Sequence, residues 1–321
     1  MAAADFLPHD AAVAGIKDVI SRLEAERAAA QRRTRWLPFV AGFWLIVGVV
    51  ALSLVFNVYA DPAEQWFSPL HVFLYVGAFV LAYAVYYWTS RLDPSLRQSQ
   101  RLAILSAAFG FLPEVRIGRG SKPSSFARMP REVAGDFDGE SFDDVIAGRY
   151  EDFGFELYEA RLTKGSGKTR DVAFKGVVVA FELVVPFPGV LVATRKLERQ
   201  TGFLRGLFAR SLEPVESGVA GLDASYAFLT DNPRAAQPLV TGQLPKALDW
   251  LAEAWPEEPA RVALNGKDGF LLLPLRKNFF ELPPATEPID YTLHVEPMIA
   301  DLSAMLATAS LVRKIGADAQ P

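Results

Sequence analysis

Two long runs of apolar residues dominate the first third of the chain. No charged residue occurs from Trp36 to Ala60 or from Gln65 to Ser90. Each run is long enough to cross the roughly 30 Å hydrocarbon core of a bilayer as a helix, and a buried helix of a soluble protein is seldom apolar on every side over such a length. The pattern therefore predicts a transmembrane hairpin at 36–90, with spans at about 37–58 and 68–90.

The basic residues around these runs predict the orientation of the hairpin. The flanking arginines are Arg32, Arg33, Arg35, Arg91, Arg97 and Arg101. The short turn at 61–64 contains no lysine or arginine. Loops that stay in the cytoplasm carry an excess of lysine and arginine, so both termini are expected on the cytoplasmic side of a multi-pass protein.

Residues 1–35 are expected to contain a cytoplasmic amphipathic helix. Over 9–35 the apolar residues Val13, Ile16, Ile20 and Leu23 recur every three or four positions, with charged residues between them. Such a stripe can pack on the chain's own cytoplasmic domain or against a second copy of the chain. The sequence leaves both interpretations open.

The pattern changes after the hairpin. Residues 91–149 are predicted to form a membrane-proximal helix, which opens at Asp93 and Pro94 and ends before Pro113, followed by a charged loop. From residue 150 to 321, short apolar segments alternate with turns and predict strands at 153–158, 172–185, 189–194, 226–229, 262–264 and 270–275. Helices are predicted at 243–255 and 297–315. Strands in runs with helices at the ends indicate a cytoplasmic α+β domain with a mainly antiparallel sheet and flanking helices.

Composition excludes several classes of function. The chain has 51% hydrophobic residues, no cysteine, three histidines and a net charge of -4. Disulfides, thiol catalysis and cysteine-ligated metals are thereby excluded, and a nucleic acid is not an expected partner because the chain lacks an excess of basic residues. No catalytic, cofactor or metal motif is recognised, which favours a non-enzymatic role and leaves an enzyme as an alternative.

Two basic segments are candidates for contact with a membrane or a partner. The first lies in a loop rich in glycine, serine and proline, and contains Arg116, Arg119, Lys122, Arg128 and Arg131. The second contains Arg199, Phe203, Arg205 and Phe208. Basic residues near anionic lipid each contribute about 1 kcal/mol to binding. The alternative for the first segment is a solvated loop. The alternative for the second is a helix that covers the sheet.

Two other features resemble known sites but depart from their patterns. Residues 165–169 end like a phosphate-binding loop, yet Leu162 replaces the first glycine and the segment joins two predicted strands, so a hairpin turn is expected. The acidic residues at 136–144 do not match a calcium-binding loop; Ser141 is expected to cap a short helix to Ile146, or the acids to pair with a basic surface. Folding could also bring carboxylates together, such as Glu156, Glu159 and Glu182.

Four short motifs carry a resemblance to a known family. They are Asp143–Gly148, Phe155–Ala160, Phe174–Gly176 and Phe279–Glu281. Over roughly 90–315 the chain resembles a bacterial family of unknown function whose members have two transmembrane helices near the N-terminus and a cytoplasmic α+β domain. The resemblance implies a bacterial inner (plasma) membrane and, because the family has no established activity, no catalytic residue.

The leading hypothesis is an inner-membrane protein whose cytoplasmic domain binds a protein partner or the lipid surface. The first alternative is a membrane-tethered enzyme that uses carboxylates, with or without a metal ion. The second is a structural membrane protein that self-assembles through the N-terminal stripe.

Overall fold

The structure, a computed structural model, describes residues 8–59, 68–89, 94–165, 170–196, 212–256, 258–276, 278–283 and 287–315. The chain divides into two compact units. One comprises residues 16–104 with 283–289 and is mainly helical, and the other contains the sheet.

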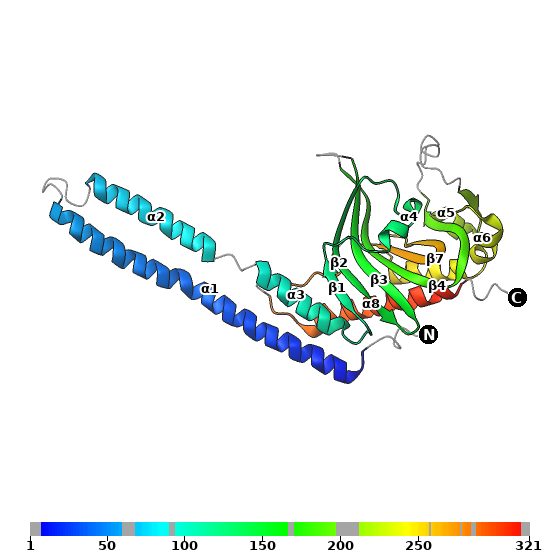
Figure 1. Cartoon of the computed structure of the whole chain (residues 1–321), viewed down its shortest axis with the longest axis horizontal. Helices are drawn as coiled ribbons and strands as arrows, with labels where there is room; N and C mark the ends of the chain where they lie inside the picture. Colours follow the sequence, from blue (N-terminus) through cyan, green and yellow to red (C-terminus); the bar gives the residue numbers. More distant parts are fainter. Residues whose placement is uncertain are drawn as a thin grey trace. The chain divides into compact units, whose positions relative to one another are not determined.

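Three helices open the chain (Figure 1). α1 (Asp10–Tyr59) is a single helix of 50 residues, so the predicted amphipathic helix and the first apolar run are continuous. α2 (Pro69–Thr89) has 21 residues, which at 1.5 Å per residue makes it about 32 Å long. α3 (Pro94–Phe109) begins at the proline that the sequence predicted as its first residue.

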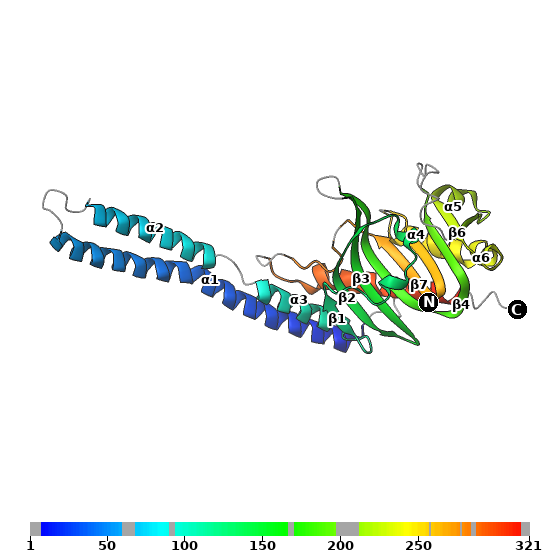
Figure 2. The ribbon, with the colours of Figure 1, turned by 45° about the horizontal axis from the view of Figure 1, so that its top comes forward.

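α1 and α2 lie side by side as an antiparallel pair (Figures 1 and 2). His71 of α2 is fully buried. Its Nδ1 lies 2.8 Å from the Ser68 hydroxyl, and its Nε2 lies 3.2 Å from the carbonyl oxygen of Ser53 on α1. The Ser53 hydroxyl lies 3.1 Å from the Tyr75 hydroxyl. A small polar cluster therefore joins the two helices near the end where residues 60–67 connect them.

The second unit is built on one sheet of seven strands. These are β1 (Arg116–Arg119), β2 (Gly139–Tyr150), β3 (Phe153–Lys164), β4 (Asp171–Arg195), β5 (Glu213–Val215), β6 (Tyr226–Thr230) and β7 (Arg261–Pro274). The order is β1-β2-β3-β4-β6-β5, with β7 also paired to β4, and every described pair is antiparallel. The α+β class and the antiparallel sheet are confirmed.

β4 organises the sheet. It joins the two strands predicted at 172–185 and 189–194 into one strand of 25 residues. Its first half lies between β3 and β7, and its last residues lie between β7 and β6. Pro186 and Pro188 fall where register shifts interrupt the pairing with β7 and after the pairing with β3 has ended, so the ladder does not need their missing N–H groups.

Helices pack on the sheet and on one another (Figures 1 and 2). The shorter ones are the 3₁₀ turn η3 (Phe126–Arg128), α4 (Arg131–Ala134), α5 (Ala220–Ser225), α6 (Pro233–Val240), α7 (Gln243–Ala254) and the π-helical turn η6 (Tyr291–Val295). Phe126, Val133 and Phe137 pack with buried residues of β3, β4 and β7 in one core cluster. α8 (Glu296–Lys314) packs on β4 and β7. With η6 it is long and apolar enough to span a membrane, but it is 67% buried and is therefore a core helix.

Two local predictions were wrong. Residues from Ser141 to Ile146, expected to form a short helix, belong to β2, and Arg116–Arg119, expected in a loop, form β1. β2 pairs with β1 on one side and with β3 on the other. Pairing on both sides, with Val145 and Ile146 buried, outweighs the weak local preference for a helix.

Candidate functional site

The first predicted basic segment is largely neutralised within the domain. Three of its five basic residues form ion pairs with carboxylates of the sheet. The pairs are Arg119–Asp143 at 2.7 Å, Lys122–Glu140 at 2.7 Å and Arg128–Asp268 at 2.8 Å. The guanidinium of Arg131 lies 4.9 Å from the centre of the Phe137 ring. The acidic stretch at 136–144 thus supplies two of the partners, as one of the sequence interpretations expected.

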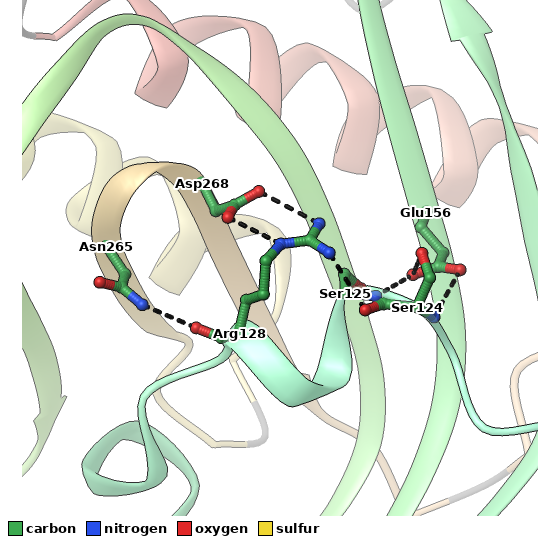
Figure 3. Close-up of polar contacts among 6 residues, drawn as sticks. All are labelled: Ser124, Ser125, Arg128, Glu156, Asn265 and Asp268. Carbon is green, nitrogen blue, oxygen red and sulfur yellow. Dashed lines mark hydrogen bonds and ion pairs between the residues drawn. The ribbon is translucent and has the colours of Figure 1, made fainter.

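Glu156 of β3 fixes the start of η3 against the sheet (Figure 3). The backbone N–H groups of Ser124 and Ser125 donate to its carboxylate at 3.0 and 2.7 Å, and the Ser124 hydroxyl donates at 3.3 Å. Hydrogen bonds to an ionised acceptor are about twice as strong as neutral ones. A single strand carboxylate therefore sets the position of the loop that precedes η3.

Arg128, the last residue of η3, fixes the other end of this segment (Figure 3). Its Nε and Nη2 donate to the two oxygens of Asp268 on β7, at 2.8 and 3.2 Å. Its Nη1 donates to the carbonyl oxygen of Ser124 at 3.1 Å, while its own carbonyl accepts from Asn265 Nδ2 at 2.8 Å. The bidentate hydrogen-bonded pair with Asp268 raises the pKa of the Arg128 guanidinium. The loop is thereby held between β3 and β7.

A cavity of about 350 Å³ opens beside this loop. Charged residues of both signs line it in equal number: Arg116, Arg128, Arg149 and Lys267 against Glu114, Glu156, Glu182 and Asp268. Arg116, Arg149 and Lys267 are exposed. Of the predicted basic residues, Arg116 and Arg128 reach this cavity; Arg199, Phe203, Arg205 and Phe208 lie outside the described residues.

Replacing Arg128 by alanine is expected to lower the stability of the domain by about 1–3 kcal/mol, because Asp268 is buried and would lose its cation. Urea unfolding of the full chain in detergent measures the loss. Lys122→Ala is the matched control: its pair with Glu140 is exposed, and we expect a loss below about 1 kcal/mol. Adding Asp268→Asn to Arg128→Ala should recover part of the stability. Equal losses for the two single variants would contradict the anchoring role of Arg128.

A second polar group lies in the sheet, where β2 bulges. The register between β2 and β3 shifts between Phe142 and Val145. A bulge of this kind redirects side chains, and here it brings Asp143 and Asp144 beside Glu159 of β3. One carboxylate oxygen from each of the three lies within 4.8 Å of the other two.

The partners of these carboxylates come from separate parts of the chain. Glu159 Oε1 accepts from the backbone N–H groups of Phe279 and Phe280, the second at 3.3 Å. Asp143 accepts from Arg119 Nε at 2.7 Å and from Asn278 Nδ2 at 3.0 Å. Asp144 is fully buried. Burial raises the pKa of Glu159 to about 7; the two backbone N–H groups oppose this shift, and the charges of Asp144 and Asp143 add to it.

The raised pKa of Glu159 predicts a pH-dependent stability. The folded carboxyl keeps its proton up to about pH 7, whereas an unfolded one loses it near 4.5. The contribution of Glu159 to the free energy of unfolding is therefore complete below about pH 4.5 and is lost as the pH rises through 7. The loss is at most about 3 kcal/mol. Urea unfolding between pH 5 and 8, in the presence of a metal chelator, should show this fall in stability for the wild type and a smaller fall for Glu159→Gln. Parallel pH profiles for the two proteins would contradict the assignment.

The structure separates the carboxylates that the sequence grouped. Glu156 and Glu182 line the first cavity, but Glu159, three residues along β3 from Glu156, faces the other side of the sheet. The alternation of strand side chains could have shown this. The roles of Asn265 and Asp268 were missed, because no local signal in β7 indicates a contact with Arg128, 140 residues away for Asp268.

Comparison with known proteins adds little. No protein-family model and no curated protein sequence matches the chain. A similar solved structure is the crystal structure of the mycobacterial trehalose monomycolate transport factor A, with 13% sequence identity and a TM-score of 0.39. The match covers 65% of this chain and 89% of that chain. Likeness at this level transfers neither a site nor a function to the present chain.

Proposed function

We propose that the chain is a membrane protein in which α1 and α2 cross the bilayer as a hairpin and hold the α+β domain at the cytoplasmic surface, where the domain binds a protein partner. The observation that carries the membrane part is the exposure of the apolar helices. The Phe39–Val58 part of α1 has a mean hydropathy of 2.6 and is 6% buried. In α2, Phe73 is 78% exposed and Phe79 is 74% exposed.

This exposure extends around both helices. The exposed large apolar residues include Phe39, Val40, Phe43, Trp44, Ile46, Val47, Val50, Leu52, Leu54, Val55 and Val58 on α1, and Leu70, Val72, Phe73, Val76, Phe79, Val80 and Leu81 on α2. Removing one such side chain from water contributes about 1.5–3 kcal/mol, so the set strongly favours lipid over water. We expect the chain to stay in the membrane pellet after washing with alkaline carbonate; release into the supernatant would contradict the proposal.

The positions of the polar side chains in α1 and α2 also support a membrane location. In hydrocarbon, polar side chains are placed toward a neighbouring helix, where they find hydrogen-bond partners. His71 and Ser53 are buried between α1 and α2, while the exposed surface of this region is apolar. Both helices therefore direct apolar side chains outward.

The mixed charge of the first cavity favours a protein partner over the lipid surface. An anionic bilayer attracts positive charge, but here Glu114, Glu182 and other carboxylates lie beside the exposed cations. Three cations of the basic segment are also neutralised by ion pairs. A concave surface with both signs of charge is complementary to a protein segment that carries both signs.

Purification of the full-length protein in mild detergent, with mass spectrometry of everything that co-elutes, tests this proposal. We expect a stoichiometric protein partner that is lost when Arg149 and Lys267 are both replaced by glutamate. The matched control replaces Arg234 and Lys246, which are exposed on α6 and α7, and should retain the partner. A preparation that contains only the chain itself, or a partner retained by the cavity variant, would overturn the proposed binding role of the cavity.

A further inference from the structure

The carboxylate cluster at the β2 bulge has an oxygen without a protein partner. Glu159 is 8% exposed, and its Oε2 has no hydrogen-bond partner among the described residues, although Oε1 accepts two backbone N–H groups. Leaving a buried acceptor unpaired costs about 1–3 kcal/mol, more when it is charged. One carboxylate oxygen of Glu159 lies within 4.8 Å of an oxygen of Asp143 and an oxygen of Asp144. The arrangement points to a positively charged ligand at this position.

The charges that act on the cluster do not balance. Arg119 donates to Asp143, and its pKa is raised by that hydrogen bond and by the charges of Asp143, Asp144 and Glu159. A bound cation would favour the ionised form of all three carboxylates, which beside one guanidinium carry two negative charges in excess. Two further cations line the adjoining cavity of about 390 Å³: Lys175, whose Nζ donates to the carbonyl oxygen of Arg276, and Arg161. A divalent cation would balance the excess at the carboxylates themselves.

The spacing of the oxygens selects between cations. Mg²⁺ binds oxygen at about 2.0–2.1 Å, so its ligands lie at most about 4.2 Å apart, whereas Ca²⁺ binds at about 2.3–2.6 Å and allows about 4.6–5.2 Å. The three oxygens lie within 4.8 Å of one another, a range that Ca²⁺ accommodates in full, whereas Mg²⁺ requires them to lie within about 4.2 Å. The adjoining cavity provides room for water molecules to complete a shell of six to eight oxygens.

We propose that Asp143, Asp144 and Glu159 form a binding site for a divalent cation of the size of Ca²⁺. Asp143 and Asp144 come from the bulge of β2 and Glu159 from β3, so the ion would hold the bulge in place. Glu159 also fixes the backbone of Phe279 and Phe280, which the ion would thereby link to β2. The site goes beyond the proposed function, because partner binding at the first cavity does not require it.

Calorimetry of the full-length protein in detergent, freed of metal by chelator, tests the site with Ca²⁺ and with Mg²⁺. We expect one Ca²⁺ per chain, a Kd for Ca²⁺ at least tenfold lower than for Mg²⁺, and a rise of several degrees in melting temperature with Ca²⁺. Asp144→Asn and Glu159→Gln should each weaken Ca²⁺ binding more than tenfold. Glu213→Gln, an exposed carboxylate of β5 outside the cluster, is the matched control and should bind as the wild type does.

The same experiment separates a cation site from a merely structural cluster. Glu159→Gln retains an oxygen that can accept from the backbone N–H groups of Phe279 and Phe280, and each substitution removes one of several like charges. The metal-free melting temperature of both variants should therefore be equal to or above that of the wild type. The absence of binding heat with 10 mM Ca²⁺ on the wild type would overturn the proposal, as would Ca²⁺ binding that persists unchanged in both variants.

Discussion

Replacing Gly176 by alanine is expected to unfold the α+β domain. Gly176 is buried in β4, with φ at +158°, and pairs with Pro274 of β7. A Cβ at this position would overlap the carbonyl oxygen of Leu273 and lie 2.8 Å from the backbone nitrogen of Leu275. Because these are backbone atoms of the neighbouring strand, no side chain can move aside. We expect a loss above about 3 kcal/mol, from overpacking at a special backbone position, measured by urea unfolding of the full chain in detergent.

Gly221→Ala is the matched control for Gly176→Ala. Gly221 lies in α5, where an added Cβ meets no atom within 4 Å. Alanine there should leave stability unchanged or raise it by up to about 1 kcal/mol, because alanine favours a helix and restricts the unfolded chain. A Gly176 variant as stable as the Gly221 variant would show that the contact between β4 and β7 differs from the one described.

Replacing Val76 and Val80 together by arginine is expected to prevent insertion of α2. Both side chains are exposed, and they lie one turn apart near the middle of the helix. Each arginine at the centre of a span costs about 2.5–3.5 kcal/mol, so the pair costs about 5–7 kcal/mol. Without α2 as a span, residues 61–64 and the α+β domain would lie on the same side of the membrane.

Cysteine labelling measures this loss of topology. The chain has no cysteine, so Ala63→Cys and Gly221→Cys can be introduced singly without removing others. In the double-arginine background, a maleimide that cannot cross membranes should label both positions or neither. Replacement of Val76 and Val80 by leucine is the control and should leave the two positions on opposite sides. The same opposite-side labelling in the arginine variant would contradict a membrane location for α2.

The class of the fold could be predicted because the apolar residues of β3, β4 and β7 follow patterns that indicate strands without any knowledge of tertiary contacts. The alternation of apolar and polar residues in 153–158 and the long apolar run from Val172 both indicate strands. The strand β2 could not be predicted in this way. Its acidic residues resemble the first turn of a helix, and only pairing with β1 and β3 on both sides stabilises it as a strand.

The candidate sites depended even less on local sequence. The position of each basic residue was visible, but the ion pairs that neutralise Arg119 and Arg128 join distant segments, 140 residues apart for Arg128 and Asp268. The cluster of Asp143, Asp144 and Glu159 depends on a bulge in β2, and no residue type in this segment indicates a bulge. Strand alternation separates Glu156 from Glu159, and this part was available from the sequence.

In the proposed topology a two-span hairpin keeps the α+β domain in the cytoplasm, and labelling of the two single-cysteine proteins in intact spheroplasts tests this arrangement. We expect Ala63→Cys to react with the impermeant maleimide in intact spheroplasts, and Gly221→Cys to react only after lysis. Labelling of Gly221→Cys before lysis, or protection of Ala63→Cys until lysis, would contradict the proposed topology.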